Sequence, residues 1–210
     1  MQISLFKKIK KYNDYFNNSS DLIKSCQIIN REIIIDIITP QIATHIDNLI
    51  RFWNLEDEDE KNLLADREPI KIYINSLGGD LASALTILDS IKISKTPVYT
   101  FNIGTVNKEA LLPYLGGHKR YAYLNSSFSW LPLTQEEPPA NESSFCNYTN
   151  YIGKMQNDIQ NFIIEKTSIT ETQFEKYGKN EWWFNAEDAI KYRICNEISR
   201  NHYYHKRFNK

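Results

Sequence analysis

The segment between residues 70 and 91 restricts the possible folds most strongly. Ile70–Asn75 is a short run rich in isoleucine, typical of a buried strand, and it leads directly into Ser-Leu-Gly-Gly at positions 76–79. Apolar residues then recur at helical spacing, at Leu81, Leu85, Leu88 and Ile91. A strand that passes through a glycine turn into a helix is typical of a layered α/β domain.

The same alternation precedes this segment. Arg31–Ile38 is rich in β-branched residues and predicts an earlier buried strand. Thr39 and Pro40 are the residue types of a helix N-cap and a first helical position. Apolar residues at helical spacing follow, at Ile42, Ile46, Leu49, Ile50 and Trp53. The acidic run Glu56–Glu60 and the residues up to Glu68 predict a solvated polar connection.

The alternation also continues after this segment. Pro97–Gly104 predicts a third strand, Lys108–Leu115 a short buried helix, and Arg120–Leu124 and Phe128–Leu131 two further short strands. Strands that alternate with helices favour parallel pairing with right-handed crossovers. The sequence therefore predicts an α/β layered domain, with no internal repeat and no linker that would divide it.

A long helix is predicted after a polar loop at residues 134–144. Its apolar residues recur at alternating steps of three and four: Phe145, Tyr148, Ile152, Met155, Ile159 and Phe162. Such a narrow stripe is typical of a helix that docks on another helix. It either packs on the chain's own core or projects towards a partner subunit, and its place after the compact α/β part favours projection. Thr170 and Gln173 predict a capping box, and Asn185–Tyr192 one more helix.

Charge and cysteine usage exclude several classes of function. The net charge of −1 gives no electrostatic reason to expect nucleic acid or an anionic membrane as a partner. Cys26, Cys146 and Cys195 are far apart and odd in number, which argues against a disulfide framework and against a zinc site. No run of 18 or more apolar residues could span a bilayer, and the basic start lacks a signal-peptide core. We therefore expect a cytoplasmic protein without a cofactor.

The histidines are scattered and predict neither a metal site nor a catalytic pair; they are His45, His118, His202 and His205. His118 lies in a basic run where a surface role is expected, and the last two lie in a basic tail.

Several segments, in order along the chain, resemble the proteolytic subunits of Clp proteases. INSLGGD at residues 74–80 is similar to the family's INSPGG turn between a strand and a helix. The other similar segments are TPVYTFNIG at 96–104, GGHKRYAYLNSSF at 116–128, EWWFNAEDAIKYRICNEI at 181–198 and, more loosely, REIIIDIITPQIATHIDNLIRFW at 31–53. Together they cover most of residues 22–199.

The resemblance implies a spiral of βα units related to the crotonases, with a protruding handle helix. It implies a single domain over residues 1–210, made of a head at 22–133, a handle region at 134–170, a C-terminal head element at 171–199 and a tail at 200–210. Members of the family stack seven-membered rings face to face through their handles. The implied partners are therefore the chain itself or an active paralogue in a ring, together with a AAA+ unfoldase, although the family's unfoldase-docking pockets are poorly matched here. The apolar stripe at 145–162 falls where the handle is expected.

The resemblance also assigns the catalytic positions. A serine peptidase of this type needs a hydroxyl nucleophile, an imidazole that accepts its proton and a carboxylate that orients the imidazole. The family's hydroxyl position is Lys108, its imidazole position is Leu131, and its carboxylate position is Glu181. Lysine has no hydroxyl and leucine cannot accept a proton, so only Glu181 keeps its chemical type.

The resemblance assigns an oxyanion site as well. The turn at Gly78 and Gly79 is expected to survive as a remnant that presents an N–H group, and Glu109 occupies the position of the second N–H donor. A carboxylate there would disfavour a developing negative charge. We expect Lys108 to be neutralised by Glu109 or Glu181 in an inactive pocket.

Two classes of function therefore follow from the sequence. The first is a non-catalytic structural or regulatory subunit of a Clp-type ring. The second is an enzyme: a serine-type endopeptidase with relocated residues, in which Lys108 would serve as base for Ser76, Ser127 or Ser129, or a crotonase-like enzyme that acts on an acyl thioester. A homologue borne by a phage or mobile element is a further alternative.

Overall fold

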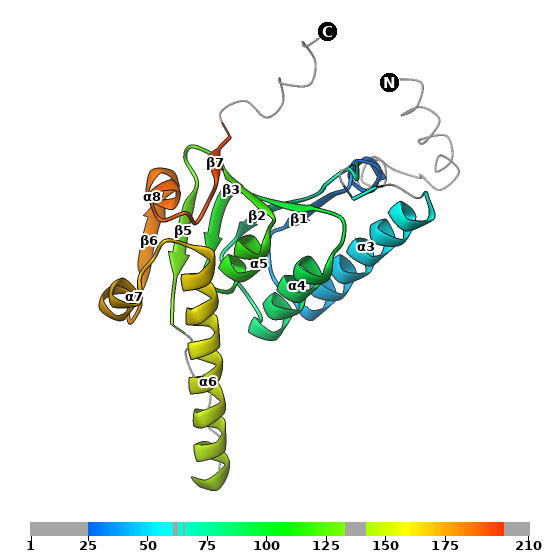
Figure 1. Cartoon of the computed structure of the whole chain (residues 1–210). Helices are drawn as coiled ribbons and strands as arrows, with labels where there is room; N and C mark the ends of the chain where they lie inside the picture. The colour runs from blue at the N-terminus through cyan, green and yellow to red at the C-terminus, as the bar shows by residue number, and fades with distance from the viewer. Residues whose placement is uncertain (1–24, 61–62, 65, 133–141, 200–210) are drawn as a thin grey trace.

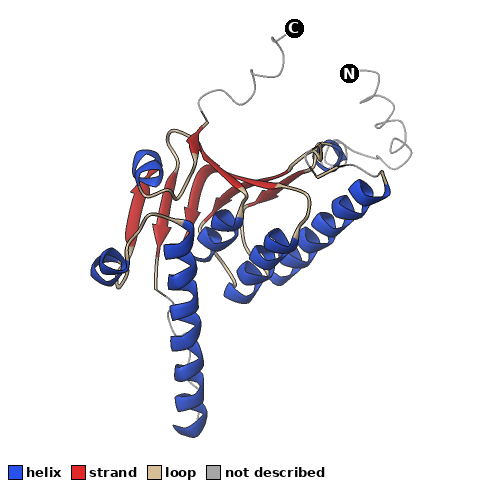
Figure 2. Ribbon diagram, in the orientation of Figure 1, coloured by secondary structure: helices blue, strands red, loops and turns tan. Residues whose placement is uncertain are grey.

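The computed structural model describes residues 25–60, 63–64, 66–132 and 142–199. In this part of the chain a seven-stranded sheet carries helices on one face, and one long helix extends away from it (Figures 1 and 2). The expectations for the first 24 residues, the loop at 133–141 and the tail with His202 and His205 fall outside the described residues.

The strands confirm the predicted α/β fold with mostly parallel pairing. Strands β1, β2, β3, β4 and β7 are neighbours in that order, and β5 pairs with the second half of β3, all in parallel. Strand β6 pairs antiparallel with β5, and the sequence did not predict this strand. The bounds are β1 (Glu32–Ile35), β2 (Ile70–Ser76), β3 (Val98–Asn107), β4 (Lys119–Ala122), β5 (Ser127–Trp130), β6 (Trp182–Asn185) and β7 (Glu197–Ile198).

Three helices cover one face of the sheet (Figure 1). They are α3 (Pro40–Asp59), α4 (Leu81–Ile93) and α5 (Leu111–Gly116), the last preceded by the 3-10 turn η2 (Lys108–Ala110). The predicted cap of α3 is confirmed, because the hydroxyl of Thr39 accepts a hydrogen bond from the N–H of Ile42 at 3.3 Å. Asp80 caps α4 in the same way, through the N–H of Ser83 at 2.8 Å. Each side chain satisfies a backbone N–H that has no partner inside its helix.

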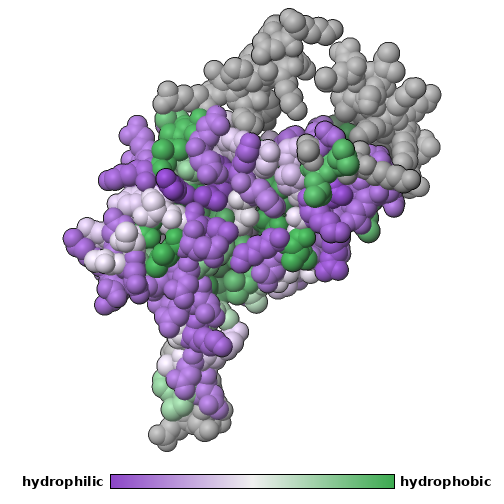
Figure 3. All heavy atoms as spheres, viewed as in Figure 1, coloured by the Kyte–Doolittle hydropathy of each residue, from purple (hydrophilic) through white to green (hydrophobic). Residues whose placement is uncertain are grey.

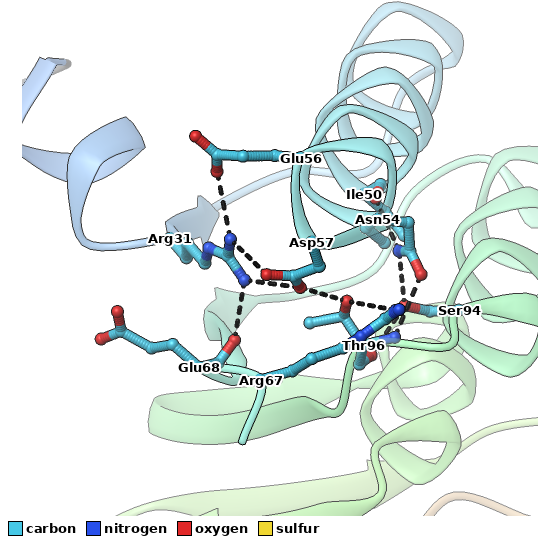
Figure 4. Close-up of polar contacts among 9 residues, drawn as sticks. All are labelled: Arg31, Ile50, Asn54, Glu56, Asp57, Arg67, Glu68, Ser94 and Thr96. Carbon is cyan, nitrogen blue, oxygen red and sulfur yellow. Dashed lines mark hydrogen bonds and ion pairs between the residues drawn. The ribbon is translucent and has the colours of Figure 1, made fainter. Parts of the chain in front are cut away.

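The solvated connection that we predicted from Glu56 to Glu68 is wrong in its first part, whereas the described residues after Asp59 lie outside helices and strands and are mostly exposed. Helix α3 continues to Asp59, and Asp57 is only 1% exposed. Arg31 donates from both terminal nitrogens to the two carboxylate oxygens of Asp57, each at 2.8 Å, and Thr96 donates to the same carboxylate at 2.6 Å (Figure 4). A buried charge is tolerated when it is paired and hydrogen-bonded. These contacts offset the cost of burying the Asp57 carboxylate, so the last turn of α3 can pack against the head.

The face of the sheet opposite these helices carries a row of aromatic rings. Tyr73, Phe101 and Tyr121 occupy matching positions on β2, β3 and β4. Their ring centroids lie 4.8 and 4.7 Å apart, and both pairs are stacked. The alternate residues of β2, Ile70, Ile72 and Ile74, are completely buried beneath the helices. The period of two in a strand thus separates an aromatic face from an aliphatic core.

The long helix α6 (Glu142–Lys166) projects from the head, as the apolar stripe predicted (Figure 1). The stripe divides in two along this helix. Ile159 and Phe162, at 4% and 9% exposure, belong to the core of the head, whereas Tyr148 and Ile152 are half-buried and Phe145 is 39% exposed. Met155 is partly buried against the same core, so three of the six stripe residues follow the alternative of packing on the chain's own core.

A groove of ≈ 420 Å³ lies where α6 leaves the head, between this helix and α4; its lining includes Leu85, Leu88, Lys92, Met155 and Ile159. Figure 3 shows hydrophobic surface beside the root of α6 and a mostly hydrophilic surface along the projecting part on this side of the molecule. Beyond α6 the chain forms α7 (Glu171–Tyr177), which begins with the predicted capping box of Thr170 and Gln173, and α8 (Ala186–Lys191).

Candidate functional site

The candidate site lies at the carboxyl ends of β2, β3 and β5. These strands are parallel neighbours, so the turns that follow them meet at the same edge of the sheet. Gly78 and Gly79 follow β2, Lys108 follows β3, and Leu131 follows β5. The fold thus brings together three positions that lie far apart in the sequence and that the resemblance assigned to one site.

Lys108 occupies a strained turn between a strand and a helix. Its backbone φ is 52°, in the left-handed region that residues other than glycine rarely adopt. Such strain typically costs about 1–3 kcal/mol, and it persists where the surrounding structure fixes the backbone, often at functional sites. Here β3 fixes one side of the turn, and η2 with the buried helix α5 fixes the other. The side chain of Lys108 itself is exposed.

Lys108 and Leu131 line the same small pocket. Its other lining residues are Leu81, Glu109, Leu112, Trp130 and Ile159, and none of the residues that line it is a histidine. The free space in the pocket, ≈ 10 Å³, is about the room that one water molecule needs. The two positions that the resemblance assigned to a nucleophile and a base therefore line one pocket, and a lysine and a leucine occupy them.

Glu181 stands next to Leu131 across the last antiparallel pair. Trp130 on β5 is in register with Trp182 on β6, so Leu131 and Glu181 each lie one residue beyond this pair. Glu181 is exposed and does not line the pocket. In the described residues Lys108 forms no ion pair with Glu181 or with Glu109, so the predicted neutralisation of Lys108 is wrong. The reason lies in the contact that Glu109 makes instead.

Glu109 turns its carboxylate towards the glycine turn. Its Oε2 accepts a hydrogen bond from the backbone N–H of Gly79 at 3.1 Å. Gly78 and Gly79 have φ values of 115° and 152°, so a side chain at either position would be strained. A Cβ at Gly78 would collide with the Glu109 carboxylate, and one at Gly79 would collide with the carbonyl oxygen of Ile38. Gly78 thus leaves the space in which the Glu109 carboxylate reaches the N–H, whereas Gly79 allows the turn to approach the backbone of Ile38.

The three serines that we considered as relocated nucleophiles lie elsewhere. The hydroxyl of Ser76 donates a hydrogen bond to the carbonyl of Gly78 and accepts one from the N–H of Gly78, both at 3.2 Å. The hydroxyl of Ser127 donates to that of Thr105 at 3.1 Å. Ser129 is 1% exposed and its hydroxyl has no partner among the described residues, but it is absent from the lining of the Lys108 pocket. None of the three lines the pocket that Lys108 lines, and none forms a hydrogen bond with Lys108 in the described residues, as a dyad would require.

The remaining candidate groups have structural roles. His118 accepts a hydrogen bond from the N–H of Val98 at 3.1 Å, outside the pocket. Burial raises the pKa of the Cys195 thiol to about 11, so this thiol is protonated at neutral pH and is a poor nucleophile. Across the described ranges we find no cluster of three or more residues that could hold a metal ion. Within those ranges, too, no helix is both long and apolar enough to cross a membrane.

Comparison with known proteins relates this architecture to one family. A family model described as Clp protease matches residues 17–202. The ATP-dependent Clp protease proteolytic subunit 2 of Treponema denticola is 31% identical over 141 residues, which are 66% of this chain and 70% of that protein. Its counterpart in Borreliella burgdorferi is 28% identical over 155 residues, which are 69% and 75% of the two chains. The solved structure of a ClpP1 mutant from Listeria monocytogenes is similar with a TM-score of 0.71 and 25% identity, covering 86% of this chain and 97% of that one.

Proposed function

Because the chain belongs to the Clp protease family, we propose that it is a non-catalytic subunit of a Clp-type proteolytic ring, with a structural or regulatory role. One observation carries this proposal: the pocket at the carboxyl ends of β3 and β5 is lined by Lys108 and Leu131, a lysine and an aliphatic residue. These are the positions at which the family's mechanism needs a hydroxyl and an imidazole.

The chemistry of acyl transfer explains why both losses matter. The hydroxyl has to attack the peptide carbonyl while the imidazole takes its proton, and the imidazole later gives that proton to the leaving amine. Loss of either member of such a pair lowers turnover by on the order of a millionfold, and loss of both leaves no acyl-enzyme at this position. The lysine does not restore the reaction as a base, because the serines at positions 76, 127 and 129 lie outside its pocket.

The retained architecture supports a role within an assembly. The head keeps the parallel sheet, the strained turn at Lys108 and the glycine turn, and α6 keeps a projecting segment with an apolar stripe. We propose that this segment, with Phe145, Tyr148 and Ile152, is the handle through which the chain enters a ring with itself or with an active paralogue. A AAA+ unfoldase as the further partner of that ring and a cytoplasmic location are part of the same proposal.

The test is to purify the tagged protein gently from its own cells, measure its native mass and identify every chain that co-purifies. A mixed ring that contains a second Clp subunit with intact serine and histidine would support the proposal and name the partner. A monomer, or an assembly without such a partner, would contradict a regulatory role in a mixed ring.

A serine-reactive fluorophosphonate probe tests the enzymatic alternative on the same preparation. We expect no labelling of this chain and no peptide hydrolysis by it. Labelling of Ser76, Ser127 or Ser129, abolished together with activity by its replacement with alanine, would establish an endopeptidase with relocated residues instead.

A further inference from the structure

The bond between Glu109 and Gly79 is a contact between an anion and a fixed backbone donor. The Gly79 N–H is held in place because the turn is tied to the strand end on its other side. The N–H of Ile38 donates to the carbonyl of Gly78 at 3.2 Å, and the N–H of Asp80 donates to the carbonyl of Ile38 at 3.0 Å. Since both flanking peptides are engaged, the N–H of Gly79 can only point towards the carboxylate.

The partner of this donor comes from the protein's own chain. A carboxylate oxygen is an anionic acceptor, as is the oxygen of a peptide C-terminus, and hydrogen bonds to ionised groups are about twice as strong as neutral ones. Glu109 lies one residue after Lys108, in the short η2 turn, and this position sets its carboxylate against the glycine turn. Gly78 leaves the space through which the side chain passes.

A cation lines the same pocket and has no anionic partner. Lys108 and Glu109 both line it, but the carboxylate is bonded to Gly79, and Lys108 forms no ion pair within the described part of the chain. Gly79 does not line that pocket, but Lys108 is rooted beside the glycine turn, because a Cβ at Gly78 would lie 3.1 Å from the Cβ of Lys108. The flexible Lys108 side chain can therefore bring its ammonium group to an anion that replaced the Glu109 side chain at the Gly79 N–H.

We propose that Glu109 is an internal ligand that closes a carboxylate-binding site made by the Gly79 N–H and the Lys108 ammonium. In the native chain Glu109 fills this site and blocks the C-terminal carboxylate of a peptide from binding there. This inference rests on the proposed function, because an occupied anion site persists only in a subunit that does not form an acyl-enzyme. Removal of the Glu109 side chain opens the site to peptide carboxylates.

The test measures binding of a fluorescent hexapeptide with a free C-terminal carboxylate, by fluorescence anisotropy on the full chain at neutral pH. We expect Glu109→Ala to bind it at least about tenfold more tightly than the native protein, because the N–H gains a charged acceptor. Glu109→Gln keeps an oxygen that accepts from Gly79, so its gain is expected to be smaller. The same peptide with an amidated C-terminus should gain nothing.

A second substitution tests whether Lys108 supplies the cation that binds the peptide carboxylate. Lys108→Met combined with Glu109→Ala should lose most of the gained affinity. Equal binding of the acid peptide by the native protein and by Glu109→Ala, or equal binding of the acid and amide peptides by the variant, would overturn the proposal. Melting temperature and native mass are measured for each variant, and Glu109→Ser replaces Glu109→Ala if the latter does not fold.

The assay also separates this inference from the proposed function. Hydrolysis of the peptide by the native chain would overturn the non-catalytic role, whatever the affinities are. Affinities that do not change in the absence of hydrolysis would overturn only the role of Glu109.

Discussion

The backbone at Lys108 is fixed independently of the residue type at this position. Its φ of 52° is imposed by the end of β3 and the start of η2, and both depend on buried neighbours and not on the Lys108 side chain. A substitution there changes the reacting group while the turn persists. The resemblance assigned this position to a nucleophile, but no pattern in the sequence predicted the strained backbone.

Glu109 marks the limit of sequence reasoning at the site. Its charge alone predicted a conflict with a developing oxyanion. The hydrogen bond to Gly79 could not be predicted, because it depends on the rotamer of the Glu109 side chain and on the closeness of two turns 30 residues apart. The same bond explains why the expected pairing of Glu109 with Lys108 is not formed.

Placing a serine at position 108 and a histidine at position 131 should not give full activity while Glu109 remains. We expect Lys108→Ser with Leu131→His to hydrolyse a fluorogenic peptide about a hundredfold more slowly than the triple variant that also carries Glu109→Met. The reason is that the carboxylate holds the Gly79 N–H, and loss of one oxyanion donor costs about 10²–10³ in turnover. A double variant as active as the triple variant would show that Glu109 leaves the N–H free when substrate binds.

At the scale of elements, the C-terminal turn of α3 was the main error of the sequence analysis. The residues 46, 50, 53 and 57 continue one helical stripe, so the spacing could have placed Asp57 on the buried face. The sequence could not show that Arg31, which precedes β1, supplies the matching charge. That pairing depends on β1 and α3 lying side by side, which is a property of the folded chain (Figure 4).

The buried ion pair predicts that replacing two neighbouring carboxylates, Asp57 and Glu58, has very different effects on the free energy of unfolding. Asp57→Ala leaves the Arg31 guanidinium, which is 7% exposed, without its bidentate partner, and we expect the free energy of unfolding to fall by about 3–5 kcal/mol. Glu58→Ala on the same turn removes an exposed ion pair with Lys95 and should change stability little. Urea denaturation of both variants measures the difference, and similar losses in both would contradict the assigned role of Asp57.

At the scale of the whole molecule, the sequence predicted the class of the fold but not how the last strands pair at the edge of the sheet. Alternating strands and helices dictated a parallel sheet, and the helix caps at Thr39 and Thr170 followed from local chemistry. The branching of the sheet did not. Residues 99–102 of β3 pair with β4, residues 105–107 pair with β5, and β6 then closes the edge in the antiparallel sense. This branching sets Leu131 beside Lys108, and only long-range pairing determines it.

The divided stripe of α6 predicts that two similar residues on one helix have different effects. Ile159, at 4% exposure, is part of the core of the head, so Ile159→Ala should lower the free energy of unfolding by about 2–5 kcal/mol. Ile152 is half-buried on the projecting part of the helix, so Ile152→Asp should leave the stability of the head within about 0.5 kcal/mol of the native value.

If this part is the handle of a ring assembly, a buried charge between two handles has no partner, and Ile152→Asp should reduce the native mass measured by light scattering. A native mass unchanged by Ile152→Asp would show that the projecting stripe is not the surface that joins subunits. A loss of stability as large as that of Ile159→Ala would show that this part of α6 packs on its own head.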